Sequence, residues 1–355
     1  LFFLWKVQNL ASMYSRRVLL FFVLFFLVAF AVKTGNPKPP SYLPTPYYSL
    51  PVSPETNDTV ALGRLLFYDN ILSGNNQVSC ASCHNSYNAF AHTDHQLSHG
   101  IFDSIGTRNA PALFNLAWKK DFMWDGATHH IDAQALAPLH DPKEMGSSME
   151  ELLSKLRSSS FYREEFFNTY QDSLINSRRV LQALAAFELS IISFDSKYDS
   201  VKEGVADFTH QEVSGYKLFD QHCSKCHTEP LFTNGEFMDN NLPVDSSLDD
   251  KGRFLVSKQK EDRYKFKVPS LRNLSYTYPY MHDGRFAKLH DVLDHYASDE
   301  QNGCDRKNDL EKPIVLSFNE RADLIAFLLT LNDDRFVFNP TYSFPEKLKN
   351  KLLED

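Results

Sequence analysis

Two copies of the pattern Cys-x-x-Cys-His carry the clearest chemistry in this sequence. They are Cys80-Ala81-Ser82-Cys83-His84 and Cys223-Ser224-Lys225-Cys226-His227. At this spacing two thiols can add to the two vinyl groups along one porphyrin edge, and the next residue places an imidazole under the iron. A zinc site built from the four thiolates is the alternative, but it leaves both adjacent histidines without a role. The pattern therefore predicts two covalently bound haem c groups, with His84 and His227 as proximal iron ligands.

The elements that must hold these motifs are mainly helices. A chain of 355 residues, 43% of them hydrophobic, has the length of about two domains and enough apolar residues for two cores. Helix starts are marked by Ser148-x-x-Glu151, Thr209-x-x-Glu212 and Ser317-x-x-Glu320, and alternating strand patterns are scarce. We expect a mainly α fold of two cytochrome-c-like haem domains. The predicted ranges are an extended leader at 32–54, the first haem domain at 55–195, the second at 196–340 and a tail at 341–355.

The N-terminus has the pattern of a secretory signal. Arg16 and Arg17 precede an apolar run over 18–32 that ends in Ala29-Phe30-Ala31, a small-x-small cleavage pattern. The run has 15 residues, whereas a membrane span needs roughly 20. We expect residues 1–31 to comprise upstream sequence before Met13 and a cleaved signal that exports the protein to the periplasm. The alternative is an uncleaved membrane anchor.

The charge of the chain bears on its partners. The formal net charge is −8 at pH 7, and cleavage after Ala31 would remove three basic residues and no acids, leaving −11. An acidic protein of this kind is not expected to bind nucleic acid. Its charge is compatible with a basic electron-donor protein.

Several further segments stand in a distinctive order along the chain. The first is Gly106-Thr107-Arg108-Asn109-Ala110-Pro111-Ala112-Leu113-Phe114-Asn115. The others are Trp124-Asp125-Gly126, then Gln134, then Asp141-Pro142-Lys143-Glu144-Met145-Gly146, Val268-Pro269-Ser270-Leu271-Arg272-Asn273 and Tyr278-Pro279-Tyr280-Met281-His282-Asp283-Gly284-Arg285-Phe286. In this order they resemble motifs of the bacterial dihaem cytochrome c peroxidase and MauG family, whose RNAPxLFN stretch the first segment matches, and the resemblance covers roughly 55–335.

The resemblance implies an arrangement in which the two haems face a shared interface, and it assigns roles to individual residues. Glu144 matches the acid–base carboxylate over the first haem, and Gln134 matches a distal amide that can hydrogen-bond peroxide. Trp124 matches the tryptophan between the haems, although an ordinary core aromatic would look the same. The positions of a calcium site between the domains fall on Asn109, Thr277 and Pro279, whose oxygen atoms suit that ion.

The sixth ligand of the second haem is predicted to be Tyr296. Leu289, Val292, Leu293 and Tyr296 share one helix face, and His290 and His295 point away from it. Better-known peroxidases carry a methionine at the matching position, whereas a tyrosine there resembles the MauG-type enzymes. A buried, non-ligating Tyr296 with a histidine or water on the iron is the alternative. An anionic phenolate should favour ferric and higher states.

The loop before the RNAP motif holds a histidine that the resemblance makes a candidate ligand of the resting first haem. His99, followed by Gly100, is the best match among His92, His95 and His99, and whether it binds iron is open. Cys304 lies in a polar segment and receives no role.

Three functions are compatible with these residues. The first is a peroxidase that reduces hydrogen peroxide with electrons from a small cytochrome c or cupredoxin. The second is a MauG-like oxidase of a protein or small-molecule target, supported by Tyr296. The third is a non-enzymatic electron carrier, which would not need Glu144 or Gln134. Homodimers are common in the family, so a homodimer is a further expectation.

Overall fold

The computed structural model describes residues 39–51, 57–298 and 313–354. The predicted signal at 1–31, part of the leader and Cys304 lie outside the described residues. Residues 36–355 form one compact unit. No helix in the described ranges is long and apolar enough to cross a membrane.

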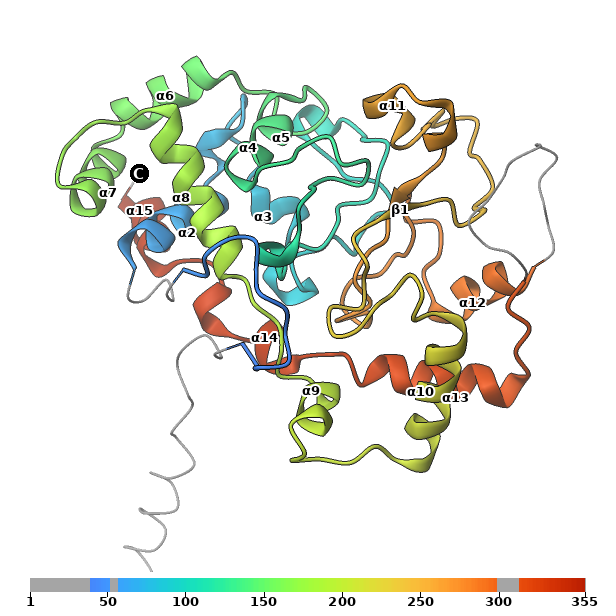
Figure 1. The fold of residues 1–355 in the computed structure, drawn as a ribbon. Coiled ribbons are helices and arrows are strands. Elements are labelled where there is room, and N and C mark those ends of the chain that lie inside the picture. Colours follow the sequence, from blue (N-terminus) through green and yellow to red (C-terminus); the bar gives the residue numbers. More distant parts are fainter. Residues whose placement is uncertain (1–38, 52–56, 299–312, 355) are drawn as a thin grey trace, which may run out of the picture. The chain divides into compact units, whose positions relative to one another are not determined.

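Helices dominate the described chain, as predicted, and the remainder is mostly loops (Figure 1). Two short antiparallel strands, β1 (Phe237–Met238) and β2 (Phe266–Lys267), pair Phe237 with Lys267 and Met238 with Phe266. Short 3-10 helices span Asn70–Leu72, Ser86–Asn88, Ile101–Asp103, Leu116–Trp118, Lys260–Asp262 and Pro340–Tyr342. The α-helices are α2 (Asp58–Tyr68), α3 (Cys80–Cys83), α4 (Ile131–Gln134), α5 (Leu136–His140), α6 (Met149–Ser158), α7 (Ser160–Tyr170), α8 (Ser177–Ser190), α9 (Lys197–Lys202), α10 (His210–His222), α11 (Phe254–Ser257), α12 (Leu289–Ala297), α13 (Phe318–Leu329), α14 (Asp334–Val337) and α15 (Glu346–Glu354).

The predicted helix starts are confirmed. Thr209 and Glu212 form a reciprocal capping box at the start of α10, and Ser317 and Glu320 form another at α13. At α6 the Ser148 side chain accepts a hydrogen bond from the backbone N–H of Glu151. These side chains satisfy backbone N–H groups that have no partner within the helix.

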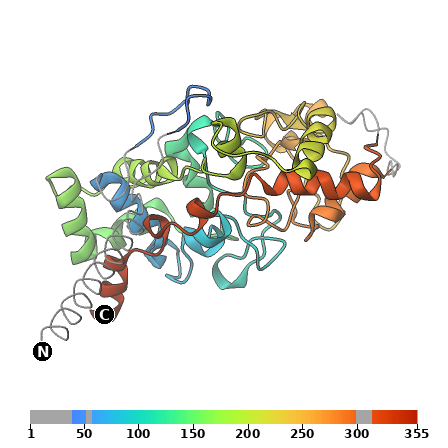
Figure 2. The ribbon, with the colours of Figure 1, turned by 90° about the horizontal axis from the view of Figure 1, so that it is seen from below.

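Each haem motif is preceded by a helix that crosses a later helix at very close range. In the first pair, α2 packs on α8, and a Cβ atom added to Gly63 would lie 1.8 Å from the carbonyl oxygen of Ala183. In the second pair, α10 packs on α13, and a Cβ at Gly215 would lie 1.9 Å from the carbonyl oxygen of Asp323. Figures 1 and 2 show α10 and α13 side by side. Only glycine permits so close an approach, because the Cβ of any other residue would collide with the carbonyl oxygen. A contact of this kind occurs in both halves of the chain.

Two apolar cores accompany these helix pairs. The first contains the buried α8 residues Val180, Leu184 and Phe187, and it includes Tyr342 and Leu348 from the predicted tail. The second core is built from residues of α9, α10 and α13, including Tyr198, Phe219 and Phe327. Val180, Leu184, Phe187 and Ile191 recur at helical spacing in the sequence, and all four are at most 1% exposed. The C-terminal segment returns to the first core rather than extending away from it.

Two asparagines from the recognised motifs join the chain at Ser193, between the helix pairs. Asn115 accepts a hydrogen bond from the backbone N–H of Ser193 at 2.9 Å and donates to its carbonyl oxygen at 3.1 Å. Asn273 donates to the Ser193 hydroxyl at 2.9 Å and accepts from the backbone N–H of Asp333. Both asparagines are buried and have positive φ. The asparagines that end these two motifs therefore both hold the segment at Ser193 in place.

Candidate active site

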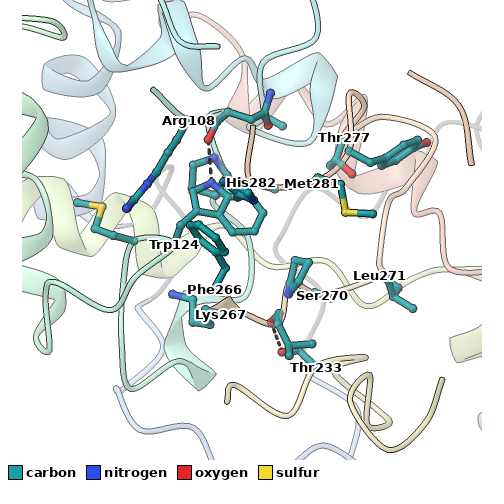
Figure 3. A pocket seen from close by; sticks show the side chains of 18 of the residues that line it. Arg108, Trp124, Thr233, Phe266, Lys267, Ser270, Leu271, Thr277, Met281 and His282 are labelled. Atoms are coloured by element: carbon teal, nitrogen blue, oxygen red, sulfur yellow. Dashed lines mark hydrogen bonds between the residues drawn. The ribbon is translucent and has the colours of Figure 1, made fainter. Parts of the chain in front are cut away.

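A cavity of about 1000 Å³ opens between the two Cys-x-x-Cys-His motifs. Ligand sites in proteins are typically roughly 300–1,000 Å³, so this volume is at the upper end of that range. Figure 3 shows part of its wall from close by. It brings together most of the predicted site residues: Cys83, His84, Asn109, Trp124, Gln134, Glu144, Cys223, Cys226, His227, Thr277, Pro279 and Tyr296. Cys80 and His99 are the two predicted site residues that do not line it.

Both motif histidines present one ring nitrogen for a metal. The Nδ1 of His84 lies 3.0 Å from the carbonyl oxygen of Phe90, so it carries the proton and donates. His227 Nδ1 lies 3.2 Å from the carbonyl oxygen of Phe232 and 3.1 Å from that of Pro269. Burial lowers the pKa of each imidazole to about 4, so both are neutral at pH 7. A neutral imidazole with Nδ1 bonded to a carbonyl is the form that binds iron through Nε2.

The four motif cysteines are free thiols in two separate pairs. Burial raises the pKa of Cys83 to about 11 and that of Cys223 to about 12, so neither is a thiolate at neutral pH. Among the described residues, no motif cysteine or histidine meets two further metal ligands. The zinc alternative therefore lacks its ligand cluster, whereas two separate thiol pairs beside neutral imidazoles fit two haem c groups.

Gln134 and Glu144 face the cavity on the side of the first motif. Gln134 ends α4 with its side chain buried, and its Oε1 atom has no hydrogen-bond partner. A buried amide oxygen without a partner costs free energy unless a bound group donates to it. Burial and the charge of Asp141 raise the pKa of Glu144 above its ordinary value. Together they provide a hydrogen-bond acceptor and a carboxyl that holds its proton more readily than an ordinary glutamate does.

Trp124 is held at the middle of the cavity wall by contacts with both halves of the chain. Its indole Nε1 donates to the carbonyl oxygen of Asn109 at 2.8 Å, and its carbonyl oxygen accepts from the N–H of Lys267 at 2.7 Å. The ring of Phe266 stacks on His282 with centroids 3.7 Å apart. Figure 3 shows Trp124, Phe266 and His282 grouped together.

Helix α12 presents the predicted face to the cavity. Leu289, Val292, Leu293 and Tyr296 all line it, and His290 and His295 do not. The hydroxyl of Tyr296 hydrogen-bonds the side chain of Asn240, which favours the phenolate, whereas burial raises the pKa of Tyr296 overall. Because the phenol faces the same cavity as the His227 ring, the geometry is compatible with axial ligation.

No motif or spacing in the sequence singled out Asn240. Its side-chain amide also donates to the sulfur of Met281 at 3.4 Å, and its carbonyl oxygen lies 3.0 Å from His295 Nε2. Asn240 therefore joins α12 to the loop that carries the HDG motif, beside Tyr296. It lies in an Asn-Asn-Leu-Pro turn that carries no motif.

His99 lies on a loop that contacts the backbone of Glu144. Its Nδ1 is 3.0 Å from Oδ1 of Asp103, and its ring stacks on His95 at 4.2 Å between centroids. The N–H of Ile101 in the same loop donates to the carbonyl oxygen of Glu144 at 2.8 Å. The loop therefore supports the position of Glu144, and ligation of iron by His99 stays a prediction.

Comparison with known proteins decides the family. Residues 57–207 match the family model described as di-haem cytochrome c peroxidase, and residues 213–332 match the cytochrome c model. The methylamine utilization protein MauG of Methylorubrum extorquens is 35% identical over 292 residues, which is 79% of each protein. This chain belongs to the dihaem cytochrome c peroxidase family. The cytochrome c551 peroxidase of Nitrosomonas europaea is 32% identical over 304 residues, 83% of this chain and 84% of that protein.

Solved structures agree with this membership of the dihaem peroxidase family. A MauG-like protein associated with microbial copper homeostasis has a TM-score of 0.77 at 32% identity, covering 88% of this chain and 99% of that one. The diheme peroxidase BthA of Burkholderia thailandensis shares the fold, with a TM-score of 0.68 at 24% identity over 79% of this chain and 87% of that one. The predicted mainly α fold of two cytochrome-c-like domains is confirmed. The chain is a peroxidase-type oxidoreductase with two haem c groups.

Proposed function

We propose that this member of the dihaem peroxidase family reduces hydrogen peroxide to water at the first haem, using electrons that enter from a small cytochrome c or cupredoxin through the second. The observation that carries the proposal is that Glu144 and the unpartnered Oε1 of Gln134 face the same cavity as His84. An electron carrier has no need of such a pair. The overall reaction consumes two electrons and two protons and converts one peroxide molecule into two water molecules.

The bound haems would supply an iron centre at which the oxygen–oxygen bond is cleaved and a store of electrons. Around that chemistry, Gln134 Oε1 accepts a hydrogen bond from a peroxide O–H and so orients the substrate. Glu144 would take a proton from one peroxide oxygen and return it to the other, which leaves as water. The raised pKa of Glu144 suits this exchange, because a carboxyl with a pKa nearer neutrality both takes up and releases protons.

Trp124 and Tyr296 would serve the electron path. Trp124 lies on the wall shared by the two motifs, and an indole there shortens the path between the porphyrins. Tyr296, supported by Asn240, would be a further ligand of the iron that His227 holds, and it would lower the potential of that iron relative to a methionine ligand. His99 is a candidate ligand of the first iron in the resting protein. Because His99 does not line the cavity, its loop would have to move toward the cavity for this ligation.

A calcium ion between the domains is part of the proposal. Asn109, Thr277 and Pro279 all line the cavity, and the Oδ1 atom of Asn109 makes none of the hydrogen bonds found in the described chain, whereas its Nδ2 donates to Gln96. Side-chain and backbone oxygens of this kind suit calcium. Bound calcium would connect Asn109 to the loop before the HDG motif and so hold the two haem domains together.

The proposal also covers the cellular location of the protein, its domain ranges and its oligomeric state. Haem c attachment and the signal pattern at 1–31 support export to the periplasm. The domain ranges 55–195 and 196–340 are supported by the helix pairs α2–α8 and α10–α13, which fall within them. A homodimer is proposed on the family resemblance alone.

The test of the peroxidase is steady-state turnover of hydrogen peroxide by the holoprotein with a reduced small cytochrome c as donor. We expect turnover that is lost in Glu144→Gln and retained in Glu150→Gln, an exposed acid at the start of α6. A wild-type protein that carries two haems but does not turn over peroxide would refute the proposal. An EPR spectrum of the ferric protein separates the carrier from the enzyme, since one high-spin and one low-spin signal indicate one open haem.

A second candidate is a MauG-like oxidase of a protein or small-molecule target. It is favoured by Tyr296 in the cavity wall and by the 35% identity to MauG. In that case the diferric protein should react directly with peroxide, seen as a change in the Soret band. No change before a reductant is added would contradict this candidate.

A further inference from the structure

We propose that Lys119 and Lys267 form a carboxylate-binding site for haem propionates at the junction between the two haem domains. The proposal deepens the proposed function, since it depends on two haems bound in the cavity. It assigns to these lysines a part in binding the cofactors and in setting their potentials.

The two lysines come from different halves of the chain and meet at the cavity. Lys119 follows the 3-10 helix Leu116–Trp118 and Lys267 lies in β2, and both half-buried side chains line the cavity. The Nζ of Lys267 donates to the carbonyl oxygen of Asp121 at 2.7 Å. Figure 3 shows Lys267 beside Trp124 and Phe266.

No carboxylate in the described chain forms an ion pair with either lysine, although the charges of Asp121 and Asp125 favour the protonated form of Lys267. The ammonium group of Lys119 forms no hydrogen bond or ion pair found among the described residues, and that of Lys267 bonds only a backbone oxygen. The neighbouring acids are engaged elsewhere: Asp121 with His129 at 2.5 Å, and Asp125 with Arg108 at 2.7 Å.

Burial and mutual repulsion make the bare pair unfavourable. Burial lowers the pKa of Lys119 to about 8, and burial together with the charge of Lys119 lowers that of Lys267 to about 7. A buried cation is expected to have a counter-ion or to lose its proton. An anion in the cavity would remove the penalty and keep both lysines charged.

Haem propionates are the anions that the site must accommodate. Each haem c carries two of them, and both Cys-x-x-Cys-His motifs border this one cavity. The three arginines that line the cavity are already paired: Arg108 with Asp125 and Asp250, Arg253 with Asp262 at 3.7 Å, and Arg272 with Asp199. Lys120 and Lys143 also line the cavity, but both are exposed. Among the described residues, Lys119 and Lys267 are therefore the half-buried cations of the cavity that have no carboxylate partner.

The test is spectroelectrochemical titration of the holoprotein, combined with resonance Raman spectra of the propionate bending modes. Replacing a nearby cation with a neutral side chain disfavours the reduced haem. We expect Lys267→Met and Lys119→Met each to lower the equilibrium constant for reduction of at least one haem about tenfold, about 59 mV for a one-electron couple. The propionate modes should shift in the same variants, and Lys267→Arg should retain both wild-type values.

Lys260→Met is the matched control, because Lys260 is exposed and does not line the cavity. It should change neither measurement. Lys267→Met removes the hydrogen bond from Lys267 to the carbonyl oxygen of Asp121 and could destabilise the protein. Lys119→Met removes no hydrogen bond found among the described residues, so it keeps the test valid if the first variant is unstable.

Three outcomes would overturn the proposal. The first is unchanged potentials in both variants at wild-type haem content, and the second is shifted potentials with unchanged propionate modes. The third is a wild-type potential that depends on added chloride or phosphate and loses this dependence in the variants, because a small anion would then occupy the site. None of these measurements uses peroxide, so failure of the peroxidase proposal is detected separately.

Discussion

The indole Nε1 of Trp124 donates a 2.8 Å hydrogen bond to the carbonyl oxygen of Asn109, whose own N–H donates to the carbonyl oxygen of His282 at 2.7 Å. The chain of bonds runs from the WDG motif through the RNAP motif to the HDG motif. The orientation of the indole therefore depends on contacts with both halves of the protein.

Trp124→Phe should slow electron transfer between the haems roughly tenfold or more and lower kcat without removing either haem. The phenyl ring is smaller and lacks the Nε1 hydrogen bond, so it spans less of the distance between the haems and is less well fixed. Stopped-flow spectroscopy after reduction of the second haem measures the rate. Trp118→Phe is the control, since Trp118 also lines the cavity and its Nε1 likewise donates to a backbone carbonyl oxygen, that of Pro44. Equal transfer rates in the wild type and Trp124→Phe would exclude the assigned role.

Glu144→Gln should lower kcat/KM for peroxide by about 10²–10⁴-fold, the usual contribution of a positioned acid–base group. Because burial and Asp141 raise the pKa of Glu144, the carboxylate form is lost on acidification at a higher pH than for an ordinary glutamate. The wild-type activity should therefore fall on the acid side from that raised pKa, and the limb should vanish in the variant. Asp141→Asn should move the limb to lower pH. An acid limb that persists in Glu144→Gln must belong to another group.

Much of this arrangement could be predicted because haem attachment and helix capping are local patterns. Two Cys-x-x-Cys-His motifs and the capping boxes at Thr209 and Ser317 each depend on residues within a few positions of one another. The Tyr296 face of α12 follows from helical periodicity alone. These features do not require knowledge of distant contacts.

The remaining features depend on segments far apart in the sequence. Asn240 and Met281 are 3.4 Å apart across the fold, and neither belongs to a pattern that indicates the contact. The meeting of Lys119 and Lys267 likewise depends on how the halves pack. The close approaches at Gly63 and Gly215 were also missed, because a glycine within a helix can serve many purposes.

Arg272→Met should destabilise the protein by about 3–5 kcal/mol, because it leaves a buried carboxylate without its partner. Arg272 is fully buried and forms two 2.8 Å hydrogen bonds to Asp199, which is 2% exposed. Urea unfolding of the holoprotein measures the loss. Arg335→Met removes an ion pair with Asp195 in which the arginine side chain is 83% exposed, and should cost about 0–1 kcal/mol. Similar losses in the two variants would contradict the structural role given to Arg272.

Tyr296→Met should raise the potential of the second haem and create a requirement for reduction before peroxide reacts, since a thioether stabilises ferrous iron better than a phenolate does. The optical spectrum and a redox titration of the variant measure both changes. Met281→Leu is the companion variant, because its sulfur lies near the same Asn240 amide. A spectrum that changes in Met281→Leu and not in Tyr296→Met would identify the methionine as the ligand.

Glu188→Gln should stabilise the protein at pH 7.5 and have little effect at pH 4. Glu188 is buried on α8, its Oε2 has no hydrogen-bond partner, and burial raises its pKa to about 8. The folded state then holds a proton that the unfolded chain loses near its ordinary pKa of roughly 4.3. Stability is therefore expected to fall as the pH rises from that value toward 8, by a few kcal/mol at most.

The measurement for Glu188 is the melting temperature of the holoprotein from pH 4 to 8. Glutamine cannot ionise, so the variant should lose this part of the pH dependence. Glu164→Gln, at an exposed position on α7, is the control and should follow the wild-type curve. A Glu188→Gln curve that also follows the wild type would mean that the pKa of Glu188 is not raised in the holoprotein, and the prediction would be wrong.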